Sequence, residues 1–253
     1  MIKFLPILIG VLPASATVIT FQEGVSPTGA YNHISQDFRG NGDTNTVGGQ
    51  TLVGYQQNGV LQIRTVMAFN LSAIPAGSTI NSITLTLVSH GNQSGTIAGV
   101  GAVNLHEVIP NGNPSNNMVE GQTSMINWAT GSAWTNSLGD YTATAMSTAT
   151  LNNTNANTTL DLGETAVFGS TSAFIAAAQT AFSAGLPLEF ILIAPTAEST
   201  TTVSHFFRFE SDNFTTVGDR PLLTIDYTIP EPGTATLAFS ALAAAALLRR
   251  RGA

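Results

Sequence analysis

Cysteine is absent from the 253-residue sequence, and lysine occurs once, at Lys3. Without cysteine, a stable fold has to come from packing, or from a metal, rather than from disulfides. Charged residues make up only 9% of the sequence, and small polar residues such as Thr, Ser, Asn and Gly take their place. This composition is typical of extracellular β proteins.

Basic residues are scarcer still once the two ends are set aside. Residues 17–229 contain four arginines, no lysine and 14 of the 15 acidic residues. Their net charge is therefore about −10 with histidine neutral. Because nucleic-acid binding requires a basic patch, we exclude nucleic acid as a partner. The same negative field disfavours strongly anionic polysaccharides unless a cation bridges the two.

The first 16 residues have the pattern of a secretory signal peptide. Lys3 supplies a positive charge, an apolar run follows at 4–12, and Ala14 and Ala16 form the small-x-small site of a signal peptidase. A permanent membrane anchor is the alternative, but the apolar run is too short to span a bilayer. We therefore expect signal peptidase to cleave after Ala16 and the chain to be exported across the inner membrane.

The C-terminal end carries three elements in order. They are Pro230-Glu231-Pro232, an apolar stretch at 233–248 and the cluster Arg249-Arg250-Arg251. This order resembles the PEP-CTERM sorting signal. The resemblance implies recognition by an exosortase, cleavage near the Pro-Glu-Pro motif, and release to the cell surface or extracellular matrix of a Gram-negative bacterium. An ordinary tail anchor is the alternative interpretation.

As a helix, the apolar stretch would be short for a transmembrane segment. Its 16 residues would rise about 24 Å against a hydrocarbon core of ~30 Å, a gap that snorkelling arginines or local thinning can close. The positive-inside rule keeps the arginines in the cytoplasm, so we expect a transient inner-membrane anchor with the body outside. The sequence thus divides into a signal peptide (1–16), a body (17–229) and a sorting signal (230–253).

Period-2 alternation of apolar residues predicts many short strands in the body. It occurs at 61–69, 83–87, 103–106, 188–192, 203–209 and 223–227, with turn residues between these segments. One helix is expected at about 172–184, where Phe174, Ala178 and Phe182 recur at every fourth residue and Gly185 can end it. We predict an all-β, jelly-roll-like antiparallel β-sandwich with one short helix.

Three segments of the body together resemble a known family. They are RTVMAFNLSAIPAG at 64–77, a segment with two tryptophans that ends GDY at 139–141, and RPLLTIDY at 220–227. Their order and spacing resemble DNRLRE-type domains, with Asn70 in place of the usual Asp of the first segment. The resemblance implies a jelly-roll-like, carbohydrate-binding-module-like sandwich of secreted proteins. Carbohydrate binding belongs to part of that family, and catalysis is not implied.

Motifs of common catalytic sites are missing from the sequence. It has no G-x-S-x-G, no H-E-x-x-H, no P-loop and no cysteine nucleophile. Glu210 and Asp212 are only two residues apart, whereas a glycosidase needs two carboxylates separated across a cleft. We therefore predict no catalytic residues and no enzymatic activity.

Two groups of residues are candidates for binding. Oxygen-bearing side chains at Asp37, Asn41, Asp43 and Asn45 suit Ca²⁺, although they lack the bidentate Glu and full spacing of an EF-hand. The same residue types also build turns without an ion, so a structural calcium is the one cofactor left open.

The second group is aromatic. Trp128, Trp134 and Tyr141 can form a platform for stacking sugar rings, or the two tryptophans can seal one end of the sandwich. His205 is in phase with Val203 and Phe207, which favours a histidine in the core over a ligand or base.

Three functions of different classes are open, because a fold does not determine function. We favour a structural or interaction protein of the cell surface or exopolysaccharide matrix. A non-catalytic carbohydrate-binding module is the second hypothesis, and a polysaccharide-degrading enzyme is the third. The expected partners are signal peptidase, exosortase, the inner membrane transiently and, for the carbohydrate hypotheses, an extracellular polysaccharide.

Overall fold

The computed structural model describes residues 16–25, 34–39, 44–46, 48–57, 61–91, 93–109, 118–124, 126–136, 138–155, 157–199 and 202–229. The expected signal peptide, apart from Ala16, and the whole expected sorting signal lie outside the described residues. So do Asn41 and Asp43 of the candidate calcium ligands.

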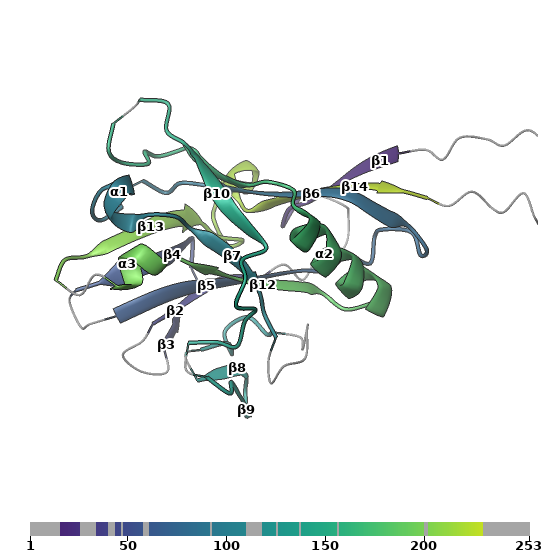
Figure 1. Cartoon of the computed structure of the whole chain (residues 1–253), viewed down its shortest axis with the longest axis horizontal. Coiled ribbons are helices and arrows are strands. Elements are labelled where there is room, and N and C mark those ends of the chain that lie inside the picture. Colours follow the sequence, from purple (N-terminus) through teal and green to yellow (C-terminus); the bar gives the residue numbers. More distant parts are fainter. Residues whose placement is uncertain are drawn as a thin grey trace, which may run out of the picture.

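The described residues form fourteen strands and a few short helices (Figure 1). The strands are β1 (Ala16–Phe21), β2 (Ile34–Arg39), β3 (Thr44–Thr46), β4 (Gln50–Gln56), β5 (Leu61–Phe69), β6 (Thr79–Val88), β7 (Asn104–Glu107), β8 (Asn127–Ala129), β9 (Ser132–Ala133), β10 (Ser147–Asn152), β11 (Thr165–Phe168), β12 (Leu188–Ile193), β13 (His205–Glu210) and β14 (Leu222–Thr228). The α-helices are α1 (Ile97–Val100), α2 (Ser172–Ala184) and α3 (Pro195–Ser199), and a 3-10 helix, η2, covers Val217–Asp219.

Antiparallel pairing links twelve of these strands into one sheet that curls on itself. The order runs β1-β14-β6-β11-β10-β7-β12-β5-β2-β3, and β5 also pairs with β4, which in turn pairs with β13. Ser89, directly after β6, bridges Phe209 of β13, so the pairing returns to β6. Figure 1 shows β6 and β14 in one layer and β5 and β12 in the other. The predicted all-β antiparallel sandwich is confirmed.

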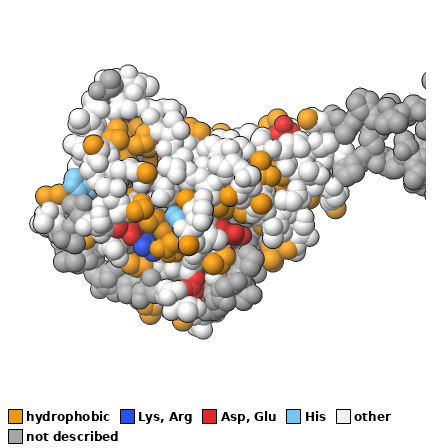
Figure 2. Space-filling model, viewed as in Figure 1, with side chains coloured by type: hydrophobic (Ala, Val, Ile, Leu, Met, Phe, Trp, Pro, Cys, Tyr) orange, Lys and Arg blue, Asp and Glu red, His pale blue; other side chains and the backbone are white. Residues whose placement is uncertain are grey.

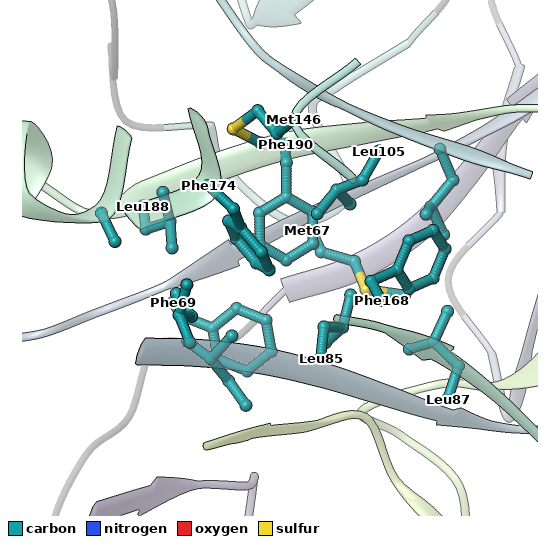
Figure 3. Packing of buried hydrophobic residues seen from close by; sticks show 14 of the residues in the cluster. Met67, Phe69, Leu85, Leu87, Leu105, Met146, Phe168, Phe174, Leu188 and Phe190 are labelled. Atoms are coloured by element: carbon teal, nitrogen blue, oxygen red, sulfur yellow. The ribbon is translucent and has the colours of Figure 1, made fainter. Parts of the chain in front are cut away.

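The inner faces of the curled sheet enclose one hydrophobic core, part of which is drawn in Figure 3. Met67 and Phe69 enter it from β5, Phe190 from β12 and Phe174 from α2, and all four are fully buried. The ring of Phe190 stacks on Phe69 at a centroid distance of 5.7 Å and meets Phe174 edge-on at 6.2 Å. Removing one such ring is expected to cost about 3–5 kcal/mol, so these contacts hold α2 firmly against the sheet.

The predicted helix is confirmed with the bounds that the sequence indicates. The side chain of Thr171 accepts a hydrogen bond from the backbone N–H of Phe174 and caps the start of α2. Gly185 ends the helix with φ 68°, a left-handed conformation that glycine adopts without steric cost. Phe174 and Ala178 are buried in the core as expected.

A second hydrophobic cluster covers the outer side of strands β5 and β12. Val66 and Ala68 of β5 and Ile191 of β12 pack there against Trp134, which follows the β8–β9 hairpin. Strand β5 is therefore buried on both faces over residues 63–69. Period-2 alternation by itself does not indicate this, because the cover comes from a segment far away in the sequence.

His205 does not occupy the core position that its phase with Phe207 predicts. Phe207 is fully buried, but Val203 lies before β13 and is 46% exposed, so that part of the prediction is wrong. His205 is half-buried, and its ring packs against Gly95 and Gly99. A Cβ at Gly95 would lie 2.1 Å from His205 Nδ1, so only glycine fits there.

Candidate functional site

The strongest candidate site is an open cavity of about 480 Å³ on the outer side of β5, β7 and β12, beside α3. We call it the Tyr141 cavity. It is lined by Gln62, Arg64, Asn104, His106, Tyr141, Ala143, Ile193, Pro195, Glu198 and Ser199. On the face drawn in Figure 2, charged side chains are few and lie among hydrophobic and uncharged polar ones.

The strand register brings the polar lining residues together. In the pairing of β12 with β7, Ile193 is opposite Asn104 and Ile191 is opposite His106. On the other side of β12, Ile191 is opposite Val66 of β5. Residues two apart on a strand share a face, so Asn104 and His106 lie on the outer face with Arg64. The polar wall of the cavity is thus built on rigid strands.

Arg64 and Glu198 form a bidentate ion pair at the floor of the cavity. Arg64 Nε donates to Glu198 Oε1 at 3.0 Å, and Arg64 Nη2 donates to Glu198 Oε2 at 2.7 Å. The two side chains are only 9% and 7% exposed. Burial opposes the charge on Arg64, but Glu198 and then Tyr141 outweigh it, so the pKa of Arg64 lies above its ordinary value. The guanidinium is therefore a fixed cation in a fixed orientation.

The turn before Tyr141 also orients Arg64. Arg64 Nη1 donates to the carbonyl of Leu138 at 2.8 Å, and Leu138 has φ 68°, unusual for a residue with a Cβ. The carboxylate of Asp140 accepts hydrogen bonds from the backbone N–H groups of Thr135 and Asn136 at 2.7 and 2.8 Å. This network holds the turn whose end presents the Tyr141 ring.

The Tyr141 ring contacts both Arg64 and His106. The Arg64 guanidinium carbon lies 5.1 Å from the ring centroid, within cation–π distance. The rings of His106 and Tyr141 meet edge-on, with centroids 5.2 Å apart. The cavity therefore joins an aromatic surface to a cation, a carboxylate and an imidazole.

His106 lines the cavity as a neutral imidazole. Its Nδ1 lies 2.7 Å from the carbonyl oxygen of Thr142, and a carbonyl can only accept, so Nδ1 carries the proton. Burial lowers the pKa of His106, and the nearby Arg64 charge lowers it further. In this tautomer Nε2 is left as a hydrogen-bond acceptor.

The two tryptophans lie beside this cavity but belong to the second hydrophobic cluster. Trp134 is 7% exposed, and its Nε1 donates to the carbonyl of Ser124 at 2.8 Å. Trp128 is partly buried against the same cluster, and its Nε1 is enclosed with no partner among the described residues. Of the three aromatic candidates, Tyr141 is the one that lines the cavity.

The candidate calcium ligands near the N-terminus are described only in part. Asp37 in β2 is opposite Thr46 of β3, and Asn45 is opposite Phe38, but the side chains of these strands and all of Asn41 and Asp43 lie outside the description. Within the described ranges, no group of three or more His, Asp or Glu side chains is arranged to hold a metal ion.

The two acidic residues near the end of β13 are separately buried. Glu210 is 1% exposed, and its Oε2 lies 2.7 Å from His90 Nδ1. Burial raises the pKa of Glu210, although His90 opposes the shift. Asp212 is 3% exposed, and burial, then the charges of Glu120 and Glu23, raise its pKa to about 8.

Sequence reasoning missed the association of Arg64, Glu198 and His106. One signal was present, because Arg64 is the one charged residue of strand β5, and buried arginines are nearly always paired. The partner could not be identified, because it lies 134 positions further along the sequence.

Among the described residues, no helix is long and apolar enough to cross a membrane.

Comparison of the chain with protein-family models and with curated proteins finds no match to either.

Proposed function

We propose that this protein is an exported cell-surface or exopolysaccharide-matrix protein whose β-sandwich binds polysaccharide without cleaving it. The main support for the proposal is the Tyr141 cavity. In this open cavity, which is lined largely by polar residues, the Tyr141 ring lies over the guanidinium of Arg64. Sugars present apolar ring faces and directional hydroxyls together, and such a surface complements both.

The cavity offers both hydrogen-bond donors and acceptors to hydroxyl groups. Arg64 has five N–H donors, of which three are used on Glu198 and Leu138, and its side chain also interacts with that of Tyr141. The N–H groups that are left over, with the amides of Gln62 and Asn104 and the Nε2 of His106, are held by strands. Because folding already fixes the orientation of these groups, they lose little conformational entropy when a ligand binds.

The carboxylate content of the cavity supports binding over hydrolysis. Glu198 is the one carboxylate among the lining residues, and Arg64 engages both of its oxygens. Glycoside hydrolysis ordinarily uses two carboxylates on opposite sides of the scissile bond. The net charge of about −10 over residues 17–229 further favours a neutral ligand, or an anionic one bridged by a cation.

The surface location is supported by the two terminal signals expected from the sequence and by the positions of the strands next to them. Ala16 at the start of β1 pairs with Thr228 at the end of β14, so residues next to the expected signal peptide and sorting signal are neighbours (Figure 1). A body held at the membrane by either end would have the same orientation.

The binding proposal is tested by replacing Tyr141 in the full chain. On a panel of neutral polysaccharides, Tyr141→Ala is expected to weaken binding at least tenfold, about 1.4 kcal/mol. Tyr141→Phe is the matched control, since it keeps the ring over the Arg64 guanidinium and removes only the hydroxyl. Arg64→Ala is unsuitable, because it leaves Glu198 buried without its counter-ion, at an expected cost of about 3–5 kcal/mol.

Two results would contradict this proposal. Unchanged binding by a folded Tyr141→Ala variant would show that the cavity is not the site. Release of reducing or unsaturated sugar by the unaltered chain would favour the polysaccharide-degrading enzyme instead.

A further inference from the structure

The connection between β10 and β11 carries oxygen-bearing side chains at regular intervals. Starting from Asn153, such residues occupy the first, third, fifth, seventh, ninth and twelfth positions, as Asn153, Asn155, Asn157, Thr159, Asp161 and Glu164. These are the ligand positions of a twelve-residue calcium loop, with the carboxylate of the twelfth residue as bidentate ligand. Two positions depart from that pattern: Asn153 replaces an Asp, and Thr158 replaces the glycine of the sixth position.

The side chains at these positions converge in the structure. Asp161 Oδ2 accepts hydrogen bonds from Asn155 Nδ2 and Asn157 Nδ2, both at 2.9 Å. Glu164 Oε1 accepts from the backbone N–H of Thr154 at 2.6 Å, and its Oε2 accepts from the N–H of Asp161 at 2.8 Å. Both carboxylates therefore turn into the loop rather than out to solvent.

These hydrogen bonds favour the charged form of both carboxylates. The side chains of Asn155, Asn157 and Thr159 lower the pKa of Asp161. The Thr154 hydroxyl and then the Asp161 N–H lower the pKa of Glu164. The loop thus holds two negative charges without a cationic side chain in the hydrogen bonds just described.

The side-chain amide of Asn153 is enclosed by the loop, and its oxygen has no hydrogen-bond donor among the described residues. Its Nδ2 lies within bonding distance of three oxygens, the Asn157 carbonyl at 2.9 Å, Asn157 Oδ1 at 3.0 Å and the Thr159 carbonyl at 2.7 Å. An amide nitrogen has two protons, and Asn157 Oδ1 also accepts from the backbone N–H of Thr159 at 2.9 Å, so these three oxygens can all have a donor. Asn153 Oδ1 is itself fully enclosed, with no partner among the described residues. An enclosed oxygen without a donor is what a cation would satisfy.

The body of the protein holds this loop in place. The carbonyl of Thr158 accepts from the N–H of Ile97 at 2.7 Å, and the N–H of Gly163 donates to Ser89 at 3.0 Å. Leu160, at the eighth position, is 1% exposed, and its carbonyl accepts from Ser89 Oγ at 3.1 Å. A loop pinned at three points loses little freedom when it binds an ion.

We propose a binding site for one Ca²⁺ ion whose ligands are Asn153, Asn155, Asn157, Thr159, Asp161 and Glu164. Asp161 and Glu164 supply the charge. The amides of Asn155 and Asn157, which direct their nitrogens at Asp161, would rotate so that the three asparagine oxygens and the Thr159 carbonyl complete an all-oxygen set. Ca²⁺ accepts such flexible sets of six to eight oxygens, whereas Mg²⁺ requires a near-ideal octahedron and keeps its waters. With two carboxylates, the expected dissociation constant is in the range of extracellular modules, about 10⁻⁴–10⁻³ M.

The test is a titration of the full chain with CaCl₂ after treatment with EDTA, with MgCl₂ as a parallel titrant. We expect binding of one Ca²⁺ by calorimetry, a melting temperature that rises with calcium concentration, and amide chemical-shift changes centred on 153–164. Mg²⁺ should give a much smaller effect. Absence of any calcium effect at about 10 mM, tenfold above the weak end of the expected range, would overturn the proposal.

Substitutions locate the ion. Glu164→Gln and Asp161→Asn should each weaken calcium binding at least tenfold. Two variants are used, so that the test remains valid if one of them does not fold in EDTA. Asp226→Asn removes a carboxylate from β14 and should leave calcium binding unchanged. Wild-type affinity in folded Glu164→Gln and Asp161→Asn, or shift changes centred on another segment, would place the ion elsewhere and refute the assignment.

Discussion

Asp212 is enclosed at 3% exposure, with the carboxylates of Glu120 and Glu23 near enough to oppose its ionisation. Asn213 Nδ2 donates to Glu120 Oε1 at 2.6 Å and lies 3.3 Å from Asp212 Oδ1, so one amide serves both acids. A carboxyl in these surroundings keeps its proton at neutral pH, because ionisation would bury a charge beside two others of the same sign.

This protonation predicts how stability changes with pH. The ordinary pKa of Asp212 is 3.8, and its pKa in the folded chain is about 8. Between these two pH values the folded chain holds a proton on Asp212 that the unfolded chain has released. The contribution to stability is therefore complete below the ordinary pKa and is lost as pH rises towards 8, by at most about 1.4 kcal/mol per pH unit.

Asp212→Asn imitates the protonated acid at every pH and is expected to flatten this dependence. Urea unfolding at pH 5, 6.5 and 8 in EDTA measures the free energy of unfolding of both chains. Asp226→Asn is the control and should keep the slope of the unaltered protein. An equal slope in Asp212→Asn would contradict the raised pKa.

At the scale of elements, the segment that contains β8 and β9 serves as a cover. It has only a two-stranded sheet of its own, and a hairpin of that size is marginal in isolation. It is stabilised by burying Trp134 against Val66 and Ile191 and by the Trp134 hydrogen bond to Ser124. The same segment delivers Leu138 and Tyr141 to the cavity, so cover and candidate site depend on one another.

Replacing Trp134 separates the two roles proposed for the tryptophans. Trp134→Ala should lower the free energy of unfolding by about 3–5 kcal/mol, because it removes a buried ring. Trp134→Phe keeps most of the packing and should lose about 1 kcal/mol for the hydrogen bond. Denaturant unfolding measures both. A Trp134→Ala variant of nearly unchanged stability that has lost glycan binding would instead indicate a stacking residue.

At the scale of the molecule, the arrangement of β1 beside β14 bears on sorting. Both ends of the described body leave from one end of the sheet. A body with both termini at one end of its sheet could remain folded while an enzyme at the membrane cleaves either terminus. Cleavage after Ala16 would remove one residue pair of β1, Ala16 with Thr228, and keep the rest.

The sorting prediction concerns the terminal arginines. Replacing Arg249, Arg250 and Arg251 with Ala removes the charges that we propose hold the C-terminal end in the cytoplasm. We expect membrane retention and C-terminal processing to be lost, as measured by cell fractionation and by the mass of the mature protein. The corresponding lysine variant retains the charges and controls for topology alone. An unaltered mass and location of the alanine variant would exclude the proposed signal.

Short-range patterns were sufficient to predict helix α2 and six of the strands. Helix α2 begins at Thr171 and ends at Gly185 because a cap, an apolar stripe and a left-handed residue act within a few positions of each other. Strand alternation likewise needs only neighbours two residues away. The all-β class, the helix and six of the fourteen strands (β5, β6, β7, β12, β13 and β14) could therefore be predicted before any tertiary contact was known.

Tertiary structure alone decided which side chains meet. Glu198 reaches Arg64 across 134 residues and Leu138 reaches it across 74, and no periodicity encodes such a pairing. The placement of Trp134 against β5, and of Tyr141 at an open cavity, has the same origin. Strand neighbours are selected by the burial of a whole core at once, so residues of the candidate site become adjacent only when the entire sheet has closed.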